Sequence, residues 1–230
     1  RDYYASRGLG DVYKRQFMGA TMESVLVGYN DPRLIKYYSK AEGGDIKDEK
    51  GNLIIAERNK IAGTYKGVPQ GTGVTVKDEN RYRLHSKSTI TKQTDAILMT
   101  AAEVWFLRAE AALRGFTSEN VKDCYEKGIT VSCQQWGVNV GDYLTSDATP
   151  SDYVDAFEAK YDVKALIKVT PKWDGGASPE EQLERILTQK WIACYPEGYE
   201  AWTEQRRTGY PQLFKVFVNN SGGAIDTNIR

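Results

Sequence analysis

Apolar and polar positions follow a helical period over much of the second half of the chain. Residues 96–113 consist of good helix formers and contain no Gly or Pro. Their apolar positions recur at helical spacing: Leu98, Ala102, Trp105, Ala109 and Ala112. We therefore predict a helix over 96–113 that is buried on most sides. Thr94 or Asp95 is expected to cap its start, and Gly115 to end it.

A second helix is predicted directly after the first. Ser118 is placed to cap it, and Glu119 suits the positive end of the helix dipole. One mostly apolar stripe then runs to Gly137, where the helix is expected to end: Val121, Tyr125, Ile129, Ser132 and Trp136. Two helices joined by a short turn predict an antiparallel hairpin similar to a tetratricopeptide unit.

The third helical block has the clearest start. Residues 178–181 read Ser-Pro-Glu-Glu, which predicts a capping box with Pro at the first helical position. The helix is expected to run to Pro196, with Glu181 and Arg185 paired across one turn. A short helix over 199–207 follows, closed by Gly209 and Pro211.

Residues 17–94 form a loop-rich region, and residues 95–230 form the helical region. Turn-forming residues recur at short intervals before residue 94. We predict a short helix over 32–38 and short strands at 53–55 and 74–76. Residues 48–52 are expected to form the turn of a hairpin. The predicted fold is therefore mainly α, with tetratricopeptide-like helix pairs and long irregular loops.

Composition excludes several classes of function. The chain has 31 Lys plus Arg residues and 31 Asp plus Glu residues, so its formal net charge is zero. It therefore has no overall positive charge that would attract nucleic acid. The single histidine, His85, excludes a multi-histidine metal site. Cys124, Cys133 and Cys194 show no CxxC spacing and are expected to be free, mostly buried thiols. We expect no metal and no cofactor.

The amino-terminal segment, residues 1–16, shows neither a helical nor a strand period. It resembles the adapter-like leader of a translated metagenomic fragment, and we expect it to be foreign to the protein. The sequence contains no apolar run long enough for a membrane-spanning helix and no visible signal peptide. The chain is therefore treated as residues 17–230.

Four stretches of the chain together resemble the SusD/RagB-type nutrient-binding outer-membrane lipoproteins. They are MESVLVGYNDPRL at 22–34, MTAAEVWFLRAEAALRGF at 99–116, YEKGITVSCQQWGV at 125–138 and LERILTQKWIACYPEGYEAWTEQRRTGYPQLF at 183–214. The resemblance implies a partial SusD-like fold, corresponding to roughly the C-terminal half of a family member. It also implies helix pairs that pack on helices outside this chain.

The same resemblance implies a function. Family members bind glycans or other nutrients on the extracellular face of the outer membrane and deliver them to a SusC-like TonB-dependent transporter. They are held in the membrane by an N-terminal lipid anchor. We therefore expect non-catalytic binding of an oligosaccharide. The alternatives are a helical-repeat scaffold that binds protein and a glycoside hydrolase.

Several polar groups could carry chemistry, but structural interpretations are favoured. Glu103 and Glu110 lie seven residues apart on one helix, about 10.5 Å along its axis, which does not exclude an inverting glycosidase. Ion pairing of such carboxylates with nearby arginines is the better interpretation. Arg206 and Arg207, with Glu200 and Glu204, are expected to tie down the last helix, with Trp191 and Trp202 as its apolar anchors.

Two further sets are expected to have no catalytic role. Asp45, Asp48 and Asn52 lack the EF-hand spacing and suit a turn. His85 is expected to be a surface or hydrogen-bonded loop residue.

Ligand contacts are expected from aromatic residues in loops, because flat rings stack on sugar faces and polar neighbours bind hydroxyl groups. The candidate binding residues are Tyr65, Arg81, Tyr82, Arg83, Trp173 and Asp174.

Overall fold

The computed structural model describes residues 16–72, 80–219 and 221–224. Its elements are α2 (Ala20–Gly28), α3 (Leu34–Tyr37), β1 (Ile46–Lys47), β2 (Leu53–Ile55), α4 (Ala101–Leu113), α5 (Val121–Gln135), α6 (Pro179–Ala193) and α7 (Gly198–Thr208), with 3₁₀ turns at Arg81–Leu84 (η1), Gly141–Thr145 (η2) and Ala159–Tyr161 (η3). The mainly α prediction is confirmed. The strand predicted at 74–76 and most of the proposed leader lie outside the described residues.

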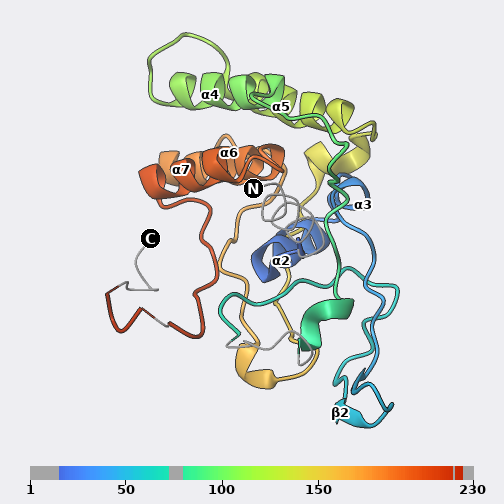
Figure 1. Cartoon of the computed structure of the whole chain (residues 1–230). Helices are drawn as coiled ribbons and strands as arrows, with labels where there is room; N and C mark the ends of the chain where they lie inside the picture. The colour runs from blue at the N-terminus through green and yellow to red at the C-terminus, as the bar shows by residue number, and fades with distance from the viewer. Residues whose placement is uncertain (1–15, 73–79, 220, 225–230) are drawn as a thin grey trace, which may run out of the picture.

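The helices form stacked layers (Figure 1). The α4–α5 hairpin packs on α6, and α7 follows α6 in the layer below the hairpin. Helices α2 and α3 lie beneath this second layer, and the β1–β2 hairpin projects at the far end of the molecule. Within the described ranges, no helix is both long enough and apolar enough to cross a bilayer.

The α4–α5 pair is closely packed. A Cβ on Gly128 of α5 would lie 2.8 Å from the ring of Phe106 on α4, and that ring is fully buried. The side chain of Tyr125 contacts the same ring edge-on, with centroids 6.2 Å apart. The predicted tetratricopeptide-like hairpin is therefore present, and its spacing depends on the missing side chain of Gly128.

The predicted start of the first helix was wrong by five residues. The Thr100 hydroxyl accepts a hydrogen bond from the Glu103 amide at 3.0 Å, so Thr100 is the cap in place of Thr94 or Asp95. The apolar pattern continues upstream of Thr100, but Leu98 is 93% exposed and belongs to the preceding loop. Gly115, with φ +75°, ends the helix as predicted.

The cap of α5 was also misplaced. The Asn120 side chain accepts from the Asp123 amide at 3.1 Å, whereas Ser118 lies outside the helix. Glu119 bonds Arg108 of α4 instead of stabilising the helix start. The local pattern predicted that Glu119 would interact with the helix dipole, but in the fold Glu119 pairs with an arginine of the neighbouring helix.

The start of α6 is the predicted capping box. Ser178 Oγ accepts from the Glu181 amide at 3.2 Å, and Glu181 Oε2 accepts from the Ser178 amide at 3.0 Å. Arg185 Nε donates to the Thr170 carbonyl at 3.1 Å, so Glu181 and Arg185 bond other groups and not each other. Helix α7 ends at Gly209, with φ +81°, as predicted.

Helix α2 was missed by the sequence analysis, which treated this region as loop. Its buried side chains surround the helix and include polar ones: Ala20, Thr21, Glu23, Ser24, Val25 and Leu26. No single apolar stripe therefore marks it. Gly28 at its end was interpreted as a turn former, but a Cβ there would lie 2.2 Å from the Ser151 amide nitrogen. Close backbone approach explains this glycine.

A fully buried arginine joins three segments at the centre of the fold. The Arg33 guanidinium binds the Asp31 carboxylate through Nε and Nη2, at 2.9 and 2.6 Å. It also donates to Ser132 on α5 and Gln189 on α6, both at 2.9 Å. The charge is thus paired and hydrogen-bonded, which a buried ion requires. The short helix predicted at 32–38 is confirmed as α3 and follows this cluster.

The β1–β2 hairpin and its turn are confirmed. Ile46 pairs with Ile55 in antiparallel register, and Asp48 Oδ1 accepts from the amides of Lys50 and Asn52 at 2.9 and 2.8 Å. These bonds use the Asp48 carboxylate as a turn former, as predicted. The three cysteines are buried and have free thiols, also as predicted.

Candidate functional site

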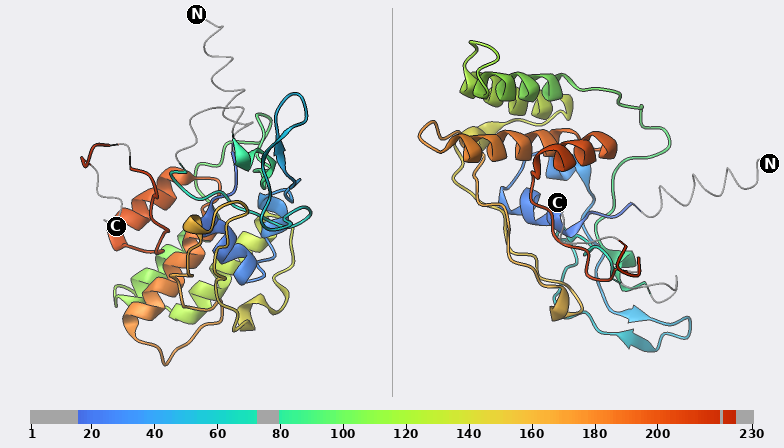
Figure 2. Two further views of the ribbon diagram at one scale, coloured as in Figure 1. Left: turned by 90° about the horizontal axis from the view of Figure 1, so that it is seen from below. Right: turned by 90° about the vertical axis from the view of Figure 1, so that its left-hand side faces the viewer.

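The six predicted binding residues fall on separate parts of the chain, and Figure 2 shows the η1 segment well apart from the loop before α6. Tyr65, Arg81, Tyr82 and Arg83 lie in the loops beside α2 and the β hairpin, and Trp173 and Asp174 lie in the loop before α6. The fold therefore does not bring all six residues into one site.

Most of the first group serves the packing of loops. Tyr82 is 2% exposed, and its ring contacts His85 and Phe157 edge-on at 5.0 and 5.8 Å. Arg81 forms an ion pair with Glu158, and Arg83 donates to the Lys47 carbonyl at 3.2 Å. Tyr65 is half-buried against the main core. Of the two aromatic rings in this group, that of Tyr65 is half-buried and that of Tyr82 is buried.

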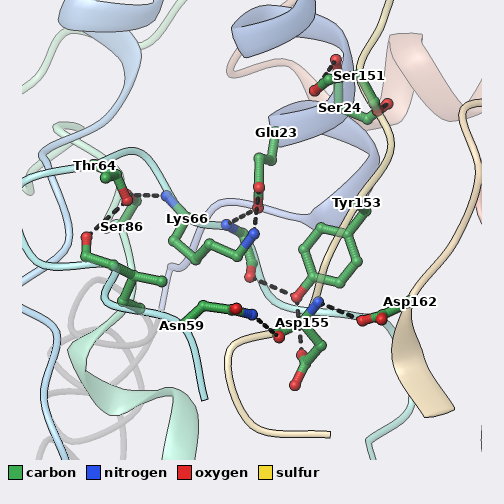
Figure 3. Close-up of polar contacts among 12 residues, drawn as sticks. Glu23, Ser24, Asn59, Thr64, Lys66, Ser86, Ser151, Tyr153, Asp155 and Asp162 are labelled. Carbon is green, nitrogen blue, oxygen red and sulfur yellow. Dashed lines mark hydrogen bonds and ion pairs between the residues drawn. The ribbon is translucent and has the colours of Figure 1, made fainter. Parts of the chain in front are cut away.

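A buried polar cluster lies next to this group (Figure 3). Glu23 of α2 accepts from Lys66 Nζ at 2.5 Å and from the Gly67 amide at 2.6 Å. The Tyr153 hydroxyl lies 3.0 Å from both the Gly67 carbonyl and Asp155 Oδ2. Asp155 Oδ1 accepts two further backbone amides, at 2.8 Å each.

Burial raises the pKa of Glu23 and of Asp155, against the opposing effect of Lys66 and the amide donors. Perturbed carboxylates of this kind occur in active sites. Here, however, Glu23 is 8% exposed and Asp155 is completely buried, so a ligand has no access to them. The cluster holds the loops at 66–67 and 151–162 onto α2.

The expectation for His85 was wrong. Its imidazole is 1% exposed, and neither ring nitrogen has a hydrogen-bond partner among the described residues. The ring packs between Tyr82 and Phe157, and burial together with nearby Lys66 lowers its pKa to about 3. The surrounding rings exclude water, so His85 behaves as a neutral core side chain and lacks the partners of a catalytic base.

The carboxylates considered for hydrolysis are parts of a charge network. Arg207 donates to both oxygens of Glu110 and also to Glu204, and Arg114 donates to Glu110 Oε1 at 2.8 Å. Burial alone would raise the pKa of Glu110, but these arginines hold it below the usual value. A lowered pKa and bidentate binding by an arginine are the opposite of what a general acid needs.

The other carboxylate, Glu103, has a raised pKa because it is partly buried and lies near Glu200, with Lys190 opposing the shift. The pairing that was predicted to tie down α7 is confirmed for Arg207, and Lys190 adds bonds to Glu200 and Glu204. Trp191 packs on the core as expected. Trp202 does not anchor the helix, because it is 58% exposed and its ring lies beneath the Arg206 guanidinium.

Of the second group of predicted residues, Trp173 borders an open hollow. Trp173 lines a cavity of about 520 Å³ together with Asn120, Val121, Lys122, Gly175 and Gln182. The indole is half-buried, and its ring packs at 5.2 Å from that of Tyr125. A fixed aromatic ring is thus surrounded by amide and ammonium groups that can bind hydroxyls.

Hydrogen bonds fix the loop that carries Trp173. Asp174 Oδ1 accepts from the Gly176 amide at 2.9 Å. Gln182 Nε2 on α6 donates to the carbonyls of Gly175 and Ala177, at 3.3 and 3.0 Å. The Tyr125 hydroxyl donates to the Pro171 carbonyl at 2.6 Å. The loop is therefore anchored from both adjacent helices, which lowers the entropic cost of ligand binding.

A second aromatic surface lies at the junction of α6 and α7. Its cavity of about 300 Å³ is lined by α2, by the turn at 195–198 and by α7, and its rings are those of Tyr38, Trp191, Tyr195 and Trp202. An adjoining open cavity continues over Pro196, Tyr199 and Trp202. The sequence analysis assigned Trp191 and Trp202 to helix packing, although the aromatic-rich turn YPEGYEAW was a visible signal.

The comparison with a family model decides the identity. The model described as "Susd and RagB outer membrane lipoprotein" matches residues 6–230. The chain belongs to the SusD/RagB family. The resemblance inferred from the sequence is confirmed, as is the outer-membrane location that the family description gives. The match begins within the proposed leader at 1–16, and the foreign origin of that segment stays a prediction.

Solved structures of other SusD/RagB proteins have the same fold. A SusD homologue from Bacteroides vulgatus is 50% identical, with a TM-score of 0.80 over 92% of this chain and 41% of its own. A chitin-binding SusD homologue from Flavobacterium johnsoniae is 38% identical, with a TM-score of 0.76 over the same shares. A SusD homologue from Bacteroides thetaiotaomicron is also 38% identical, with a TM-score of 0.75 over 88% and 40%.

This SusD/RagB chain thus spans about two fifths of the length of the structures it matches. No curated protein matches it. In the described ranges, no cluster of three or more His, Cys, Asp or Glu side chains could hold a metal ion.

Proposed function

We propose that this chain is part of a protein that binds an extracellular oligosaccharide without cleaving it. The observation that carries this proposal is the Trp173 hollow, in which a fixed indole ring is bordered by Asn120, Lys122 and Gln182. Family membership supports it, since one relative is described as chitin-binding. Sugar rings would stack on the indole, and the side-chain amides and ammonium would bind hydroxyl groups.

The remaining predicted residues have a smaller part in this proposal. Tyr65 is a second half-buried ring, in the segment between β2 and η1. Arg81, Tyr82 and Arg83 would act indirectly, because their side chains hold the loops there. Asp174 would shape the binding loop through its bond to the Gly176 amide.

Delivery to a SusC-like TonB-dependent transporter, with an N-terminal lipid anchor in the membrane, completes the proposed role. The family description as outer-membrane lipoproteins supports the anchor. The transporter would carry out the energy-dependent step, and the protein to which this chain belongs would only bind the ligand. The binding of both Glu110 carboxylate oxygens by Arg207 supports a non-catalytic role.

Isothermal titration against a panel of oligosaccharides that includes chitohexaose tests the proposal. We expect heat with at least one glycan and a dissociation constant at least tenfold weaker in Trp173→Ala, a loss of about 1.4 kcal/mol. Tyr199→Ala removes a more exposed ring, on α7, and should leave binding unchanged.

Three outcomes contradict the proposal. The first is no heat with any glycan together with capture of a peptide partner, which favours the helical-repeat scaffold. The second is glycan binding that Trp173→Ala does not weaken. The third is release of shorter sugars that Glu103→Gln abolishes while circular dichroism shows an unchanged fold, which favours a hydrolase.

A further inference from the structure

The polar groups that line the Trp173 hollow are mostly hydrogen-bond donors. Asn120 Oδ1 already accepts from the Asp123 amide at 3.1 Å, which leaves the Asn120 amino group for a ligand. Lys122 contributes an ammonium group, and the indole of Trp173 contributes an N–H. Among the described residues that line the hollow, none is Asp or Glu. A site of this composition favours a ligand group that is rich in acceptor oxygens.

A glycine keeps the indole N–H open to the hollow. A Cβ built on Gly175 would lie 3.7 Å from Trp173 Nε1, and both residues line the hollow. A side chain at this position would therefore stand over the donor. The glycine leaves room for an acceptor oxygen of a ligand beside the ring.

The charge of Lys122 is only weakly compensated. The Glu126 carboxylate, one turn along α5, lies 3.8 Å from Nζ, which is beyond hydrogen-bond distance, and the Lys122 side chain is 55% exposed. The nearby Asp174 carboxylate accepts from the Gly176 amide and does not line the hollow. An exposed ion pair of this length contributes little, so the ammonium can bind an anionic ligand group.

A second positive charge lies at the base of the loop that carries Trp173. The buried Arg185 follows Gln182 by one turn of α6, and its Nε donates to the Thr170 carbonyl at 3.1 Å. Its Nη1 group has no hydrogen-bond partner in the described part of the chain. Burial raises the pKa of Tyr125, whose ring packs on Trp173, and Arg185 opposes that rise. A buried cation that lacks full pairing is costly, and an anion nearby would lower this cost.

We propose that the Trp173 hollow binds an acidic sugar, whose carboxylate or sulfate group pairs with Lys122 while its ring face stacks on the indole. The pairing is charge-assisted, and either anionic group offers several acceptor oxygens to the neighbouring N–H donors. Arg185 would act through its charge at the base of the loop and not by contact. The proposal rests on the proposed function, which it narrows to glycans that carry an anionic group.

Calorimetric titration with matched acidic and neutral glycans tests the proposal. One pair is hexagalacturonate and its methyl ester, and the other is a carrageenan hexasaccharide and its desulfated form. The two pairs distinguish a carboxylate from a sulfate. We expect at least one acidic member to bind about tenfold more tightly than its neutral counterpart. Added NaCl should weaken that binding, because salt screens an exposed ammonium.

Two substitutions on α5 separate a specific contact from a general effect of charge. Lys122→Gln should weaken binding of the acidic glycan about fivefold, because it removes the charge and keeps a polar side chain. Lys127→Gln, at another exposed lysine of α5, is the matched control and should leave binding unchanged. Circular dichroism should show the same fold for both variants.

The outcomes distinguish this proposal from the proposed function. If only neutral glycans bind, among them chitohexaose, the proposal is wrong and glycan binding stands. The same holds if an acidic glycan binds equally well to Lys122→Gln and to the wild type. If no glycan produces heat, both the proposal and the proposed function are wrong.

Discussion

Arg207 and Glu110 are 97 residues apart in sequence and form a bidentate ion pair, with N–O distances of 2.8 and 2.6 Å. The pair joins the end of α7 to α4 and uses the planar fork of the guanidinium. Glu110 is nearly buried, whereas Arg207 keeps some contact with solvent. Glu110, which the sequence alone leaves open as a catalytic carboxylate, therefore has a structural role: it holds α7 against α4.

Replacement of Arg207 should weaken the packing of α7 on the helix layer. Arg207→Met leaves Glu110 with Arg114 alone, and we expect urea denaturation to show a loss of about 1–2 kcal/mol of unfolding free energy. The matched control is Arg206→Met, since that guanidinium packs on the exposed ring of Trp202. The control should change stability by less than about 0.5 kcal/mol. Equal effects of the two substitutions would contradict the assignment.

The stability of the protein should depend on His85 at mildly acidic pH. Its pKa is about 3 in the folded protein and near 6.5 when unfolded. Between these values the unfolded chain binds the extra proton, so stability falls as pH falls. At pH 5 the loss relative to pH 8 should be about 2 kcal/mol from this residue.

His85→Phe removes that proton site and keeps an aromatic ring between Tyr82 and Phe157. The variant should be no less stable than the wild type at pH 8, because neither imidazole nitrogen has a partner there in the described part of the chain. The difference in unfolding free energy between variant and wild type should then grow as pH falls. A pH-independent difference would show that His85 is not the titrating group.

Gly128 should be indispensable for the α4–α5 spacing. Gly128→Ala places a methyl group 2.8 Å from the buried Phe106 ring, and we expect thermal unfolding to show a cost of about 1–3 kcal/mol. The gain in helix propensity of about 1 kcal/mol does not offset the clash. Gly198→Ala, where the added methyl meets no atom within 4 Å, should be neutral or slightly stabilising. A stabilised Gly128→Ala would mean that α5 can move away from α4.

The loop that carries Trp173 should lose affinity for glycan when its anchor is removed. Gln182→Glu abolishes both hydrogen bonds from Nε2 to the carbonyls of Gly175 and Ala177. We expect a three- to tenfold weaker dissociation constant by titration, with little change in melting temperature because the side chain lies near the surface. Gln134→Glu, an exposed position on α5, is the matched control. This prediction rests on the proposed function and fails with it.

Local signals in the sequence determined the helical class, the capping box at Ser178, the turn at Asp48 and the glycines that end α4, α5 and α7. These features depend on hydrogen bonds between residues close in sequence, so composition and spacing suffice to predict them. The sequence motifs likewise sufficed for the family. Trp173 was a candidate because it is an aromatic residue in a loop, and the fold places it beside an open hollow.

Only the tertiary structure decided which residues are buried and which are paired. Helix α2 has no amphipathic stripe because neighbours surround it, and His85 is buried because its ring packs between Tyr82 and the distant Phe157. The partner of Glu110 is Arg207, and the ring of Trp202 is exposed, because both depend on where α7 docks. Contacts between distant segments follow from the packing of the whole chain, and no local pattern encodes them.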